Sequence, residues 1–191
     1  MNNDKIYIKK IIQSQLGAIV EDEKKANILT MYRNVKKNKL DLMKINSAEV
    51  YEYTYEIDEY LSIKQMDKIV ENLSEELLIE VVIIKKIENE HAEIYHFDGQ
   101  TFYLISDKEQ IPNIYKSMEY IFIFFIDLEI ISQIGGSLLF DALKQTGEFK
   151  SYLKDIVPSS HKQLKVGIHA LARSFKLNIN KVAILDVLEV L

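Results

Sequence analysis

The chain has 191 residues, of which 48% are hydrophobic and 28% are charged, a composition typical of a folded globular protein. It contains no cysteine, which excludes disulfides, thiolate zinc sites, iron–sulfur clusters and a thiol nucleophile. The formal net charge of −5 argues against a general nucleic-acid-binding protein, because contact with phosphates requires a basic surface.

The first fifty residues are rich in Lys and Asn and carry two sets of apolar residues at helical spacing: Ile8, Ile11, Ile12, Leu16 and Ile19, then Ile28, Met31, Tyr32 and Val35. We therefore expect an N-terminal helical extension over residues 1–50 and one α+β domain over residues 51–191. The first residues lack the continuous apolar stretch and cleavage site of a secretory signal, so we expect a cytoplasmic protein.

Residues 51–57 alternate in polarity, since Glu52, Thr54 and Glu56 separate Tyr51, Tyr53, Tyr55 and Ile57. This alternation predicts a half-buried strand. The interleaved carboxylates exclude an aromatic platform for nucleic-acid bases. Ser62 and Gln65 form a capping-box pattern, and apolar residues at helical spacing from Ile63 to Leu73 predict a helix. The β-branched run Leu77 to Ile87 predicts a central strand.

The segment EIYHFDGQTFYLIS, Glu93 to Ser106, predicts a β-hairpin. Two alternating, aromatic-rich runs flank the pair Asp98-Gly99, which suits the central positions of a type I′ turn because both need positive φ. From Asp107 the pattern predicts a helix through Ile111, Ile114, Tyr115 and Met118.

The run Tyr120 to Ile130 predicts a strand that is buried on both faces, and its apolar part of seven residues is too short to cross a membrane. Helical stripes follow Gly135-Gly136 and end before Pro158. We then expect a helix over residues 161–178, capped by Ser159 or Ser160, and a last helix through Ile184, Val187, Leu188 and Leu191.

Motifs for common chemistries are missing from this sequence. The four histidines form no HExxH-type pair, so we expect no metal site, and there is no G-x-S-x-G elbow, Walker loop or G-x-G-x-x-G. The one candidate anion site is the expected helix start at Ser159, Ser160 and Lys162, where free backbone N–H groups and the helix dipole would meet a phosphate. An ordinary capped helix has the same pattern.

The order of the elements resembles the nitroreductase superfamily, and within it the SagB-type azoline dehydrogenases. The resembling elements are, in order, the helix YLSIKQMDKIVENL, the strand LLIEVVIIKKI, the hairpin with Tyr95-His96-Phe97-Asp98 and Leu104, a helix, the strand YIFIFFIDLEI, and the helix HKQLKVGIHALARSFKLN with Phe175-Lys176-Leu177. The resemblance implies a central antiparallel or mixed sheet flanked by helices. It also implies FMN chemistry on ribosomal peptide natural products, and a homodimer or a partner subunit.

The flavin-binding signature of that family should lie near Val50 to Tyr55, where this sequence reads VYEYTY. The chain also has only two arginines, Arg33 and Arg173, for binding a phosphate. We therefore expect a scaffold or partner subunit that has lost FMN. Two alternatives stay open: an active FMN-dependent azoline oxidoreductase that uses Ser159, Ser160 and Lys162, or a small α+β interaction or immunity-type protein outside the superfamily.

Overall fold

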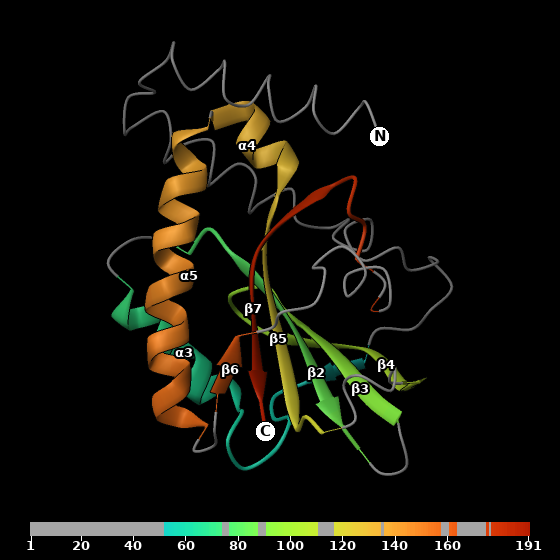
Figure 1. The fold of residues 1–191 in the computed structure, drawn as a ribbon. Helices are drawn as coiled ribbons and strands as arrows, with labels where there is room; N and C mark the ends of the chain where they lie inside the picture. The colour runs from blue at the N-terminus through green and yellow to red at the C-terminus, as the bar shows by residue number, and fades with distance from the viewer. Residues whose placement is uncertain are drawn as a thin grey trace.

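The computed structural model of the chain describes residues 52–73, 77–87, 91–110, 117–134, 136–157, 161–163, 175 and 177–191. Within these residues one antiparallel sheet lies against a layer of helices (Figure 1). The predicted α+β class, with a central sheet and packed helices, is therefore confirmed. The predicted N-terminal extension, residues 1–50, lies outside the described residues.

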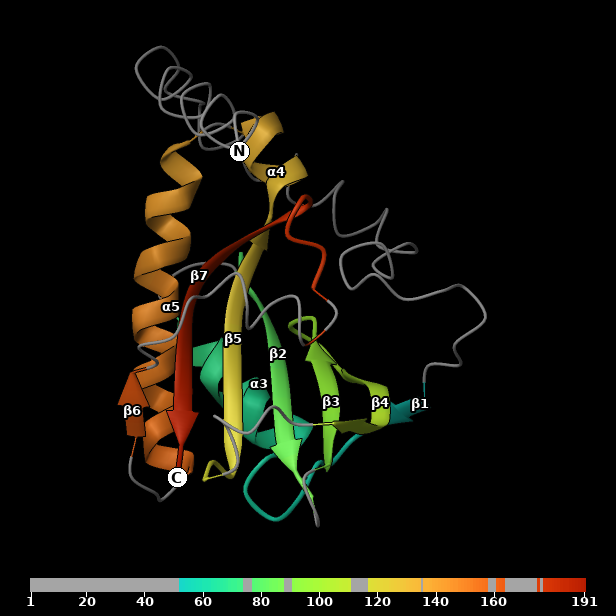
Figure 2. The same cartoon turned by 45° about the vertical axis from the view of Figure 1, so that its right-hand side comes forward.

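Seven strands form the sheet: β1 (Glu52–Thr54), β2 (Glu80–Lys86), β3 (His91–Phe97), β4 (Phe102–Gln110), β5 (Tyr120–Asp127), β6 (His161–Gln163) and β7 (Val182–Val190). Their order across the sheet is β1-β4-β3-β2-β5-β7-β6, and each neighbouring pair is antiparallel. Figure 2 shows β2 and β5 in the middle of the sheet, with the short strands β1 and β6 at its two ends.

The helices are α3 (Ile63–Asn72), α4 (Leu128–Ile134) and α5 (Ser137–Ile156), and they bury one face of the sheet. The predicted capping box at the start of α3 is present, with the Ser62 N–H donating to Gln65 Oε1 at 2.7 Å. The core of this face joins residues of all three helices to the sheet: Met66 and Ile69, Ile130 and Ile131, Leu138, Ala142, Phe149 and Leu153, against Val81, Ile83, Phe97, Phe122 and Phe124.

The opposite face of the sheet carries a second core, in which Phe175 and Leu177 pack with strand residues. All eight residues of β5 are buried, since alternate side chains enter the two cores. The sequence prediction of a strand buried on both faces is therefore confirmed for Tyr120–Asp127. The predicted strands over 77–87, 93–97 and 101–106 are confirmed as β2, β3 and β4.

The β3–β4 hairpin is present, but the two central positions of its turn lie one residue further along the chain than expected. The Asp98 N–H donates to the Thr101 carbonyl, so the central positions are Gly99 and Gln100 rather than Asp98 and Gly99. Gly99 has φ +95°, and a glycine at the first central position is typical of a type II′ turn. Asp98 instead accepts bonds from the N–H groups of Gln100 and Thr101 at 3.0 and 3.1 Å.

Two boundaries around the hairpin and β5 were predicted wrongly. The helix expected from Asp107 is a strand as far as Gln110, because β4 continues its pairing with β3 to Gln110. The strand expected as far as Ile130 ends at Asp127, where α4 begins. Asp127 Oδ1 accepts from the Glu129 N–H at 2.7 Å, which is the bond of a helix N-cap.

Two predicted helices near the C-terminal side are also wrong where the structure describes them. His161–Gln163 is β6, paired with β7, and residues 177–178 are not helical. The segment Val182–Val190 is β7, held between β5 and β6. Pairing within the sheet prevails here over the local helical pattern, as tertiary context often does. Among the described helices, none is long and apolar enough to cross a membrane.

Candidate functional site

The sequence predicted an anion site at a helix start formed by Ser159, Ser160 and Lys162. The described residues contain no such helix start. Ser159 and Ser160 are outside these residues, and the backbone of Lys162 is in the strand β6, opposite Glu189 of β7. A strand has no helix dipole, so this part of the physical argument for a phosphate loses its basis at Lys162. Contact of the three residues with a phosphate stays a prediction.

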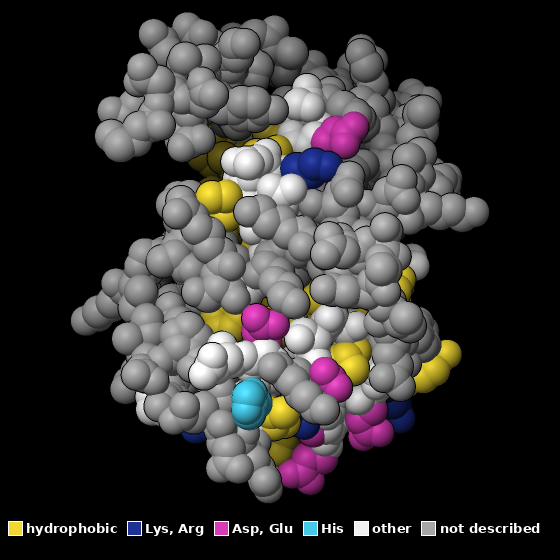
Figure 3. Space-filling model, turned by 90° about the vertical axis from the view of Figure 1, so that its right-hand side faces the viewer, with side chains coloured by type: hydrophobic (Ala, Val, Ile, Leu, Met, Phe, Trp, Pro, Cys, Tyr) yellow, Lys and Arg dark blue, Asp and Glu magenta, His cyan; other side chains and the backbone are white. Residues whose placement is uncertain are grey.

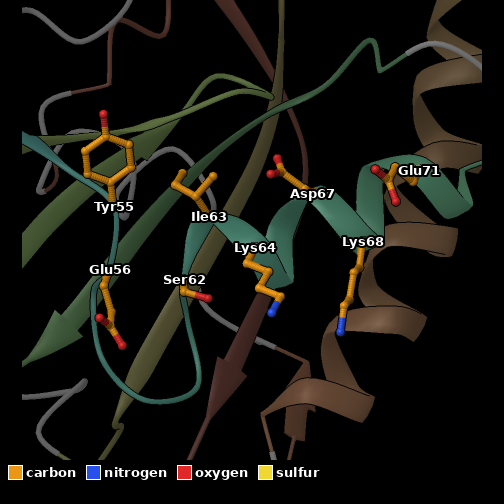
Figure 4. A pocket seen from close by; sticks show the side chains of 8 residues that line it. All are labelled: Tyr55, Glu56, Ser62, Ile63, Lys64, Asp67, Lys68 and Glu71. Atoms are coloured by element: carbon orange, nitrogen blue, oxygen red, sulfur yellow. The ribbon is translucent and has the colours of Figure 1, made fainter.

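The structure instead presents an open groove between the end of β1 and the outer side of α3. Its volume is about 680 Å³, and it is lined by Tyr55, Glu56, Ser62, Ile63, Lys64, Asp67, Lys68 and Glu71. Figure 4 shows Glu56, Lys64 and Lys68 pointing to one side, with the side chains of Tyr55, Ile63 and Asp67 on the other. The groove therefore combines apolar and charged side chains.

The chain between β1 and α3 folds back on itself to form this groove. The Ile63 N–H donates to the Tyr55 carbonyl at 2.8 Å, and Glu56 forms a bridge with Ser62. Asp58 then fixes the turn, because its Oδ1 accepts from the N–H groups of Tyr60 and Leu61 at 2.9 and 3.0 Å.

The same turn is fastened to the sheet. Lys85 Nζ of β2 donates to the Ile57 carbonyl at 2.8 Å and lies 3.4 Å from Asp58 Oδ2, which also accepts from the Tyr120 hydroxyl of β5. Two central strands thus hold the groove in place. Sites on rigid elements keep their geometry better than sites on free loops.

Tyr55 is an exposed aromatic side chain of the groove, with 67% of its surface accessible. The sequence placed it in a half-buried strand, but β1 ends at Thr54, one residue earlier. Tyr60 is also exposed, and the neighbouring Glu59 raises its pKa above the usual value of 10 by a hydrogen bond and by its negative charge. The Tyr60 hydroxyl is thus neutral at neutral pH.

Charges of both signs line the groove. Charges of both signs also lie close together, with hydrophobic side chains beside them, at the lower right of the face drawn in Figure 3. In the groove itself Glu56, Asp67 and Glu71 outnumber Lys64 and Lys68. Such a surface does not favour a dianionic phosphate, but it can pair with a ligand that carries both signs.

The histidines add no metal site in the part of the chain that the structure describes. His91 is exposed at the start of β3, and His96 is buried beside Glu80. The side chain of His161 and all of His169 are outside the description. No group of three or more His, Asp or Glu side chains among the described residues is arranged to hold a metal ion.

No protein-family model matches the chain, and no curated protein matches it significantly. Among solved structures, a chain from the "E. coli Microcin synthetase McbBCD complex with truncated pro-MccB17 bound" is similar, with 12% sequence identity and a TM-score of 0.45. The match covers 94% of this chain and 85% of that chain. At this identity and TM-score, the likeness does not establish a shared fold or activity.

Proposed function

We propose that this chain is a protein-binding subunit of an assembly that modifies peptides, and that the groove beside α3 receives a segment of a polypeptide partner. The observation that carries the proposal is the exposed Tyr55 at the side of a groove with charges of both signs. Tyrosine supplies a large contact area at low entropic cost, and it is enriched where proteins meet. A polypeptide segment offers both the apolar groups and the charges that this groove can pair.

The peptide-modifying setting rests on the order of the elements. The helix α3, the strand β2, the β3–β4 hairpin and the strand β5 follow one another in the order that the resemblance to SagB-type azoline dehydrogenases implies, whereas residues 161–163, at the start of its last helix, form the strand β6. In this proposal the chain is a divergent nitroreductase-like subunit that has lost FMN and works beside an active enzyme, as a partner subunit or as a homodimer. The excess of acidic side chains in the groove is consistent with a role other than phosphate binding.

The test is co-purification of the tagged full chain from its own host, with Tyr55→Ala as the variant and Phe140→Ala as the matched control. Phe140 is another exposed aromatic residue, 66% accessible, but it lies on α5 outside the groove. We expect a cofactor-bearing enzyme subunit with the wild type and the control, and about tenfold less of it with Tyr55→Ala, the loss for about 1.4 kcal/mol of binding energy. Equal recovery with Tyr55→Ala would contradict the proposal.

An absorption spectrum of the same preparation separates the alternatives. We expect a colourless protein that gains little thermal stability from added FMN, whereas a ligand at a hundredfold excess over its Kd adds about 2.7 kcal/mol. A yellow preparation that loses its flavin when Ser159, Ser160 and Lys162 are replaced by Ala would instead identify an FMN-dependent oxidoreductase. Recovery of a partner that is no peptide-modifying enzyme would favour the interaction or immunity-type alternative.

A further inference from the structure

The outer face of α3, which lines the groove, carries charged side chains in two rows. Asp67 and Glu71 are four residues apart, as are Lys64 and Lys68, and all four are exposed. Residues four apart lie one above the other on a helix, with a rise of about 6 Å, so the first pair forms an acidic row and the second a basic row. Figure 4 shows Lys64 and Lys68 pointing to one side of the helix and Asp67 to the other.

These four charges have no partner within the described part of the chain. None of the four side chains forms an ion pair or a hydrogen bond there. Like charges four residues apart destabilise a helix, whereas opposite charges at this spacing stabilise it, as for Lys144 and Glu148 of α5 at 3.8 Å. The two rows therefore do not stabilise α3 itself, but they would be favourable beside opposite charges of a bound partner.

The backbone at the start of the groove is already hydrogen-bonded. The Tyr55 carbonyl accepts from the Ile63 N–H at 2.8 Å, and the Ser62 N–H donates to Gln65 Oε1 at 2.7 Å. The Ser62 carbonyl accepts from the N–H groups of Gln65 and Met66 at 3.1 and 3.0 Å. Addition of a strand depends on free main-chain groups, whereas a helix makes its main-chain bonds within itself and is bound through side chains. The groove therefore favours a helix over an extended segment.

We propose that the groove receives an amphipathic helix of the partner, which lies along α3 with an acidic row beside Lys64 and Lys68 and a basic row beside Asp67 and Glu71. This inference rests on the proposed function, because it specifies the segment that the groove receives. Charges at i, i+4 on the partner helix have the same rise of about 6 Å as the rows of α3, so both rows can be paired at once. Apolar residues of the same helix contact the aromatic and aliphatic side chains of the groove.

The test exchanges the signs of the two rows in the full chain. The variant K64E/D67K/K68E/E71K keeps the net charge of the protein and changes only where the charges lie. We expect it to recover about tenfold less of the partner than the wild type in co-purification from the host, the loss for about 1.4 kcal/mol of binding energy. Its thermal unfolding midpoint should stay close to that of the wild type, because the exchanged side chains are exposed.

The matched control is K144E/E148K, which exchanges an i, i+4 pair on α5 outside the groove and should recover the partner as the wild type does. Undiminished recovery by the row-exchange variant, together with a loss in Tyr55→Ala, would overturn the helix with charged rows and leave the proposed function standing. Recovery of no partner that depends on Tyr55 would overturn both.

Carbodiimide cross-linking of the wild-type complex tests the conformation of the bound segment, because it joins amines directly to carboxylates in contact. Lys64 and Lys68 should be joined to partner carboxylates that are three or four residues apart, as on one face of a helix. Cross-links to carboxylates two residues apart would indicate a strand and would overturn the inference.

Discussion

At the scale of single residues, Gly99 shows how a local conformation and a tertiary contact can require the same residue. Its φ of +95° is strained for any residue with a Cβ atom. A Cβ added there would also lie 2.7 Å from Leu77 Cδ2, inside the usual contact distance. The positive φ therefore disfavours other residues, and a Cβ atom would in addition require the end of the flexible Leu77 side chain to shift.

Replacing Gly99 by Val should lower the free energy of unfolding by about 1–3 kcal/mol, because the side chain is forced into the positive-φ region and against Leu77. Urea unfolding at equilibrium measures the change. The control is Gly147→Ala in α5, where an added Cβ meets nothing within 4 Å and should stabilise the helix by about 0.5–1 kcal/mol. Equal stability of Gly99→Val and the wild type would refute this account of the turn.

The sequence predicted the glycine of this turn but placed its role one position off. The dipeptide Asp98-Gly99 is the usual signal for two central residues with positive φ. The length of the loop decides otherwise, since Phe97 pairs with Phe102 and four residues lie between them. Asp98 then serves as an acceptor for the N–H groups of Gln100 and Thr101, which a dipeptide pattern does not reveal.

At the scale of elements, α5 is tied to the sheet by a polar contact as well as by its apolar face. The Gln145 side chain is buried, and its Oε1 accepts from the Leu78 N–H at 2.8 Å, just before β2 begins. This bond gives the Leu78 N–H a hydrogen-bond acceptor before the pairing of β2 with its neighbouring strands begins. It also fixes the position of α5 relative to the start of β2.

Replacing Gln145 by Met, which has a similar length but no carbonyl, should lower the free energy of unfolding by about 1–3 kcal/mol, because the buried Leu78 N–H loses its acceptor. Thermal or urea unfolding measures the change. The neighbouring Lys144 is exposed and lies 3.8 Å from Glu148, so Lys144→Ala should change the stability by less than about 0.5 kcal/mol. A Gln145→Met protein as stable as Lys144→Ala would show that the bond is dispensable.

The wrong prediction of a helix at β7 has a specific structural cause. The register with β5 shifts between Phe124 and Phe125, so that Asp186 and Ile184 face consecutive residues of β5. Across this bulge the side chains change face, and Ile184 and Val187, three residues apart, enter the same core. Spacing by three imitates a helix, although each part of the strand alternates by two.

Other elements were predicted from signals that stay within one segment. The capping box at Ser62 and the apolar stripe of α3 are local, as is the continuous apolar run of β5. The Asp127 cap of α4 is also local, and the sequence Asp-Leu-Glu could have indicated it. The groove at Tyr55 could not be predicted, because it depends on where β1 ends and on Lys85 and Asp58, which are far apart in the sequence.

At the scale of the whole molecule, the described helices and one face of the sheet share a core. Phe124 of β5 is fully buried in it and meets Phe149 of α5 edge to face, with ring centroids 5.8 Å apart. Such aromatic contacts between layers couple the unfolding of the helix to that of the sheet. We therefore expect the described domain to unfold in one transition.

Replacing Phe124 by Ala should lower the free energy of unfolding by about 3–5 kcal/mol, because it leaves a cavity between β5 and α5. Far-ultraviolet and tyrosine fluorescence signals should then lose their native values together. Phe140→Ala, at an exposed site on α5, should stay within about 0.5 kcal/mol of the wild type. Separate transitions for the two signals would argue against a shared core.

The order of strands in the sheet also implies an order in which the chain acquires its shape during synthesis. β2, β3 and β4 close short hairpins, whereas β5 meets β7 only after the twenty residues of α5 have intervened. Until residues 182–190 arrive, one edge of the stretch YIFIFFID has no strand partner, and such a stretch invites pairing with other chains. A nascent polypeptide that has left the ribosome only as far as α5 would therefore depend on chaperones. Pulse-labelled hydrogen exchange during refolding should find the β2–β3–β4 amides protected before those of β7, and simultaneous protection would argue against this order.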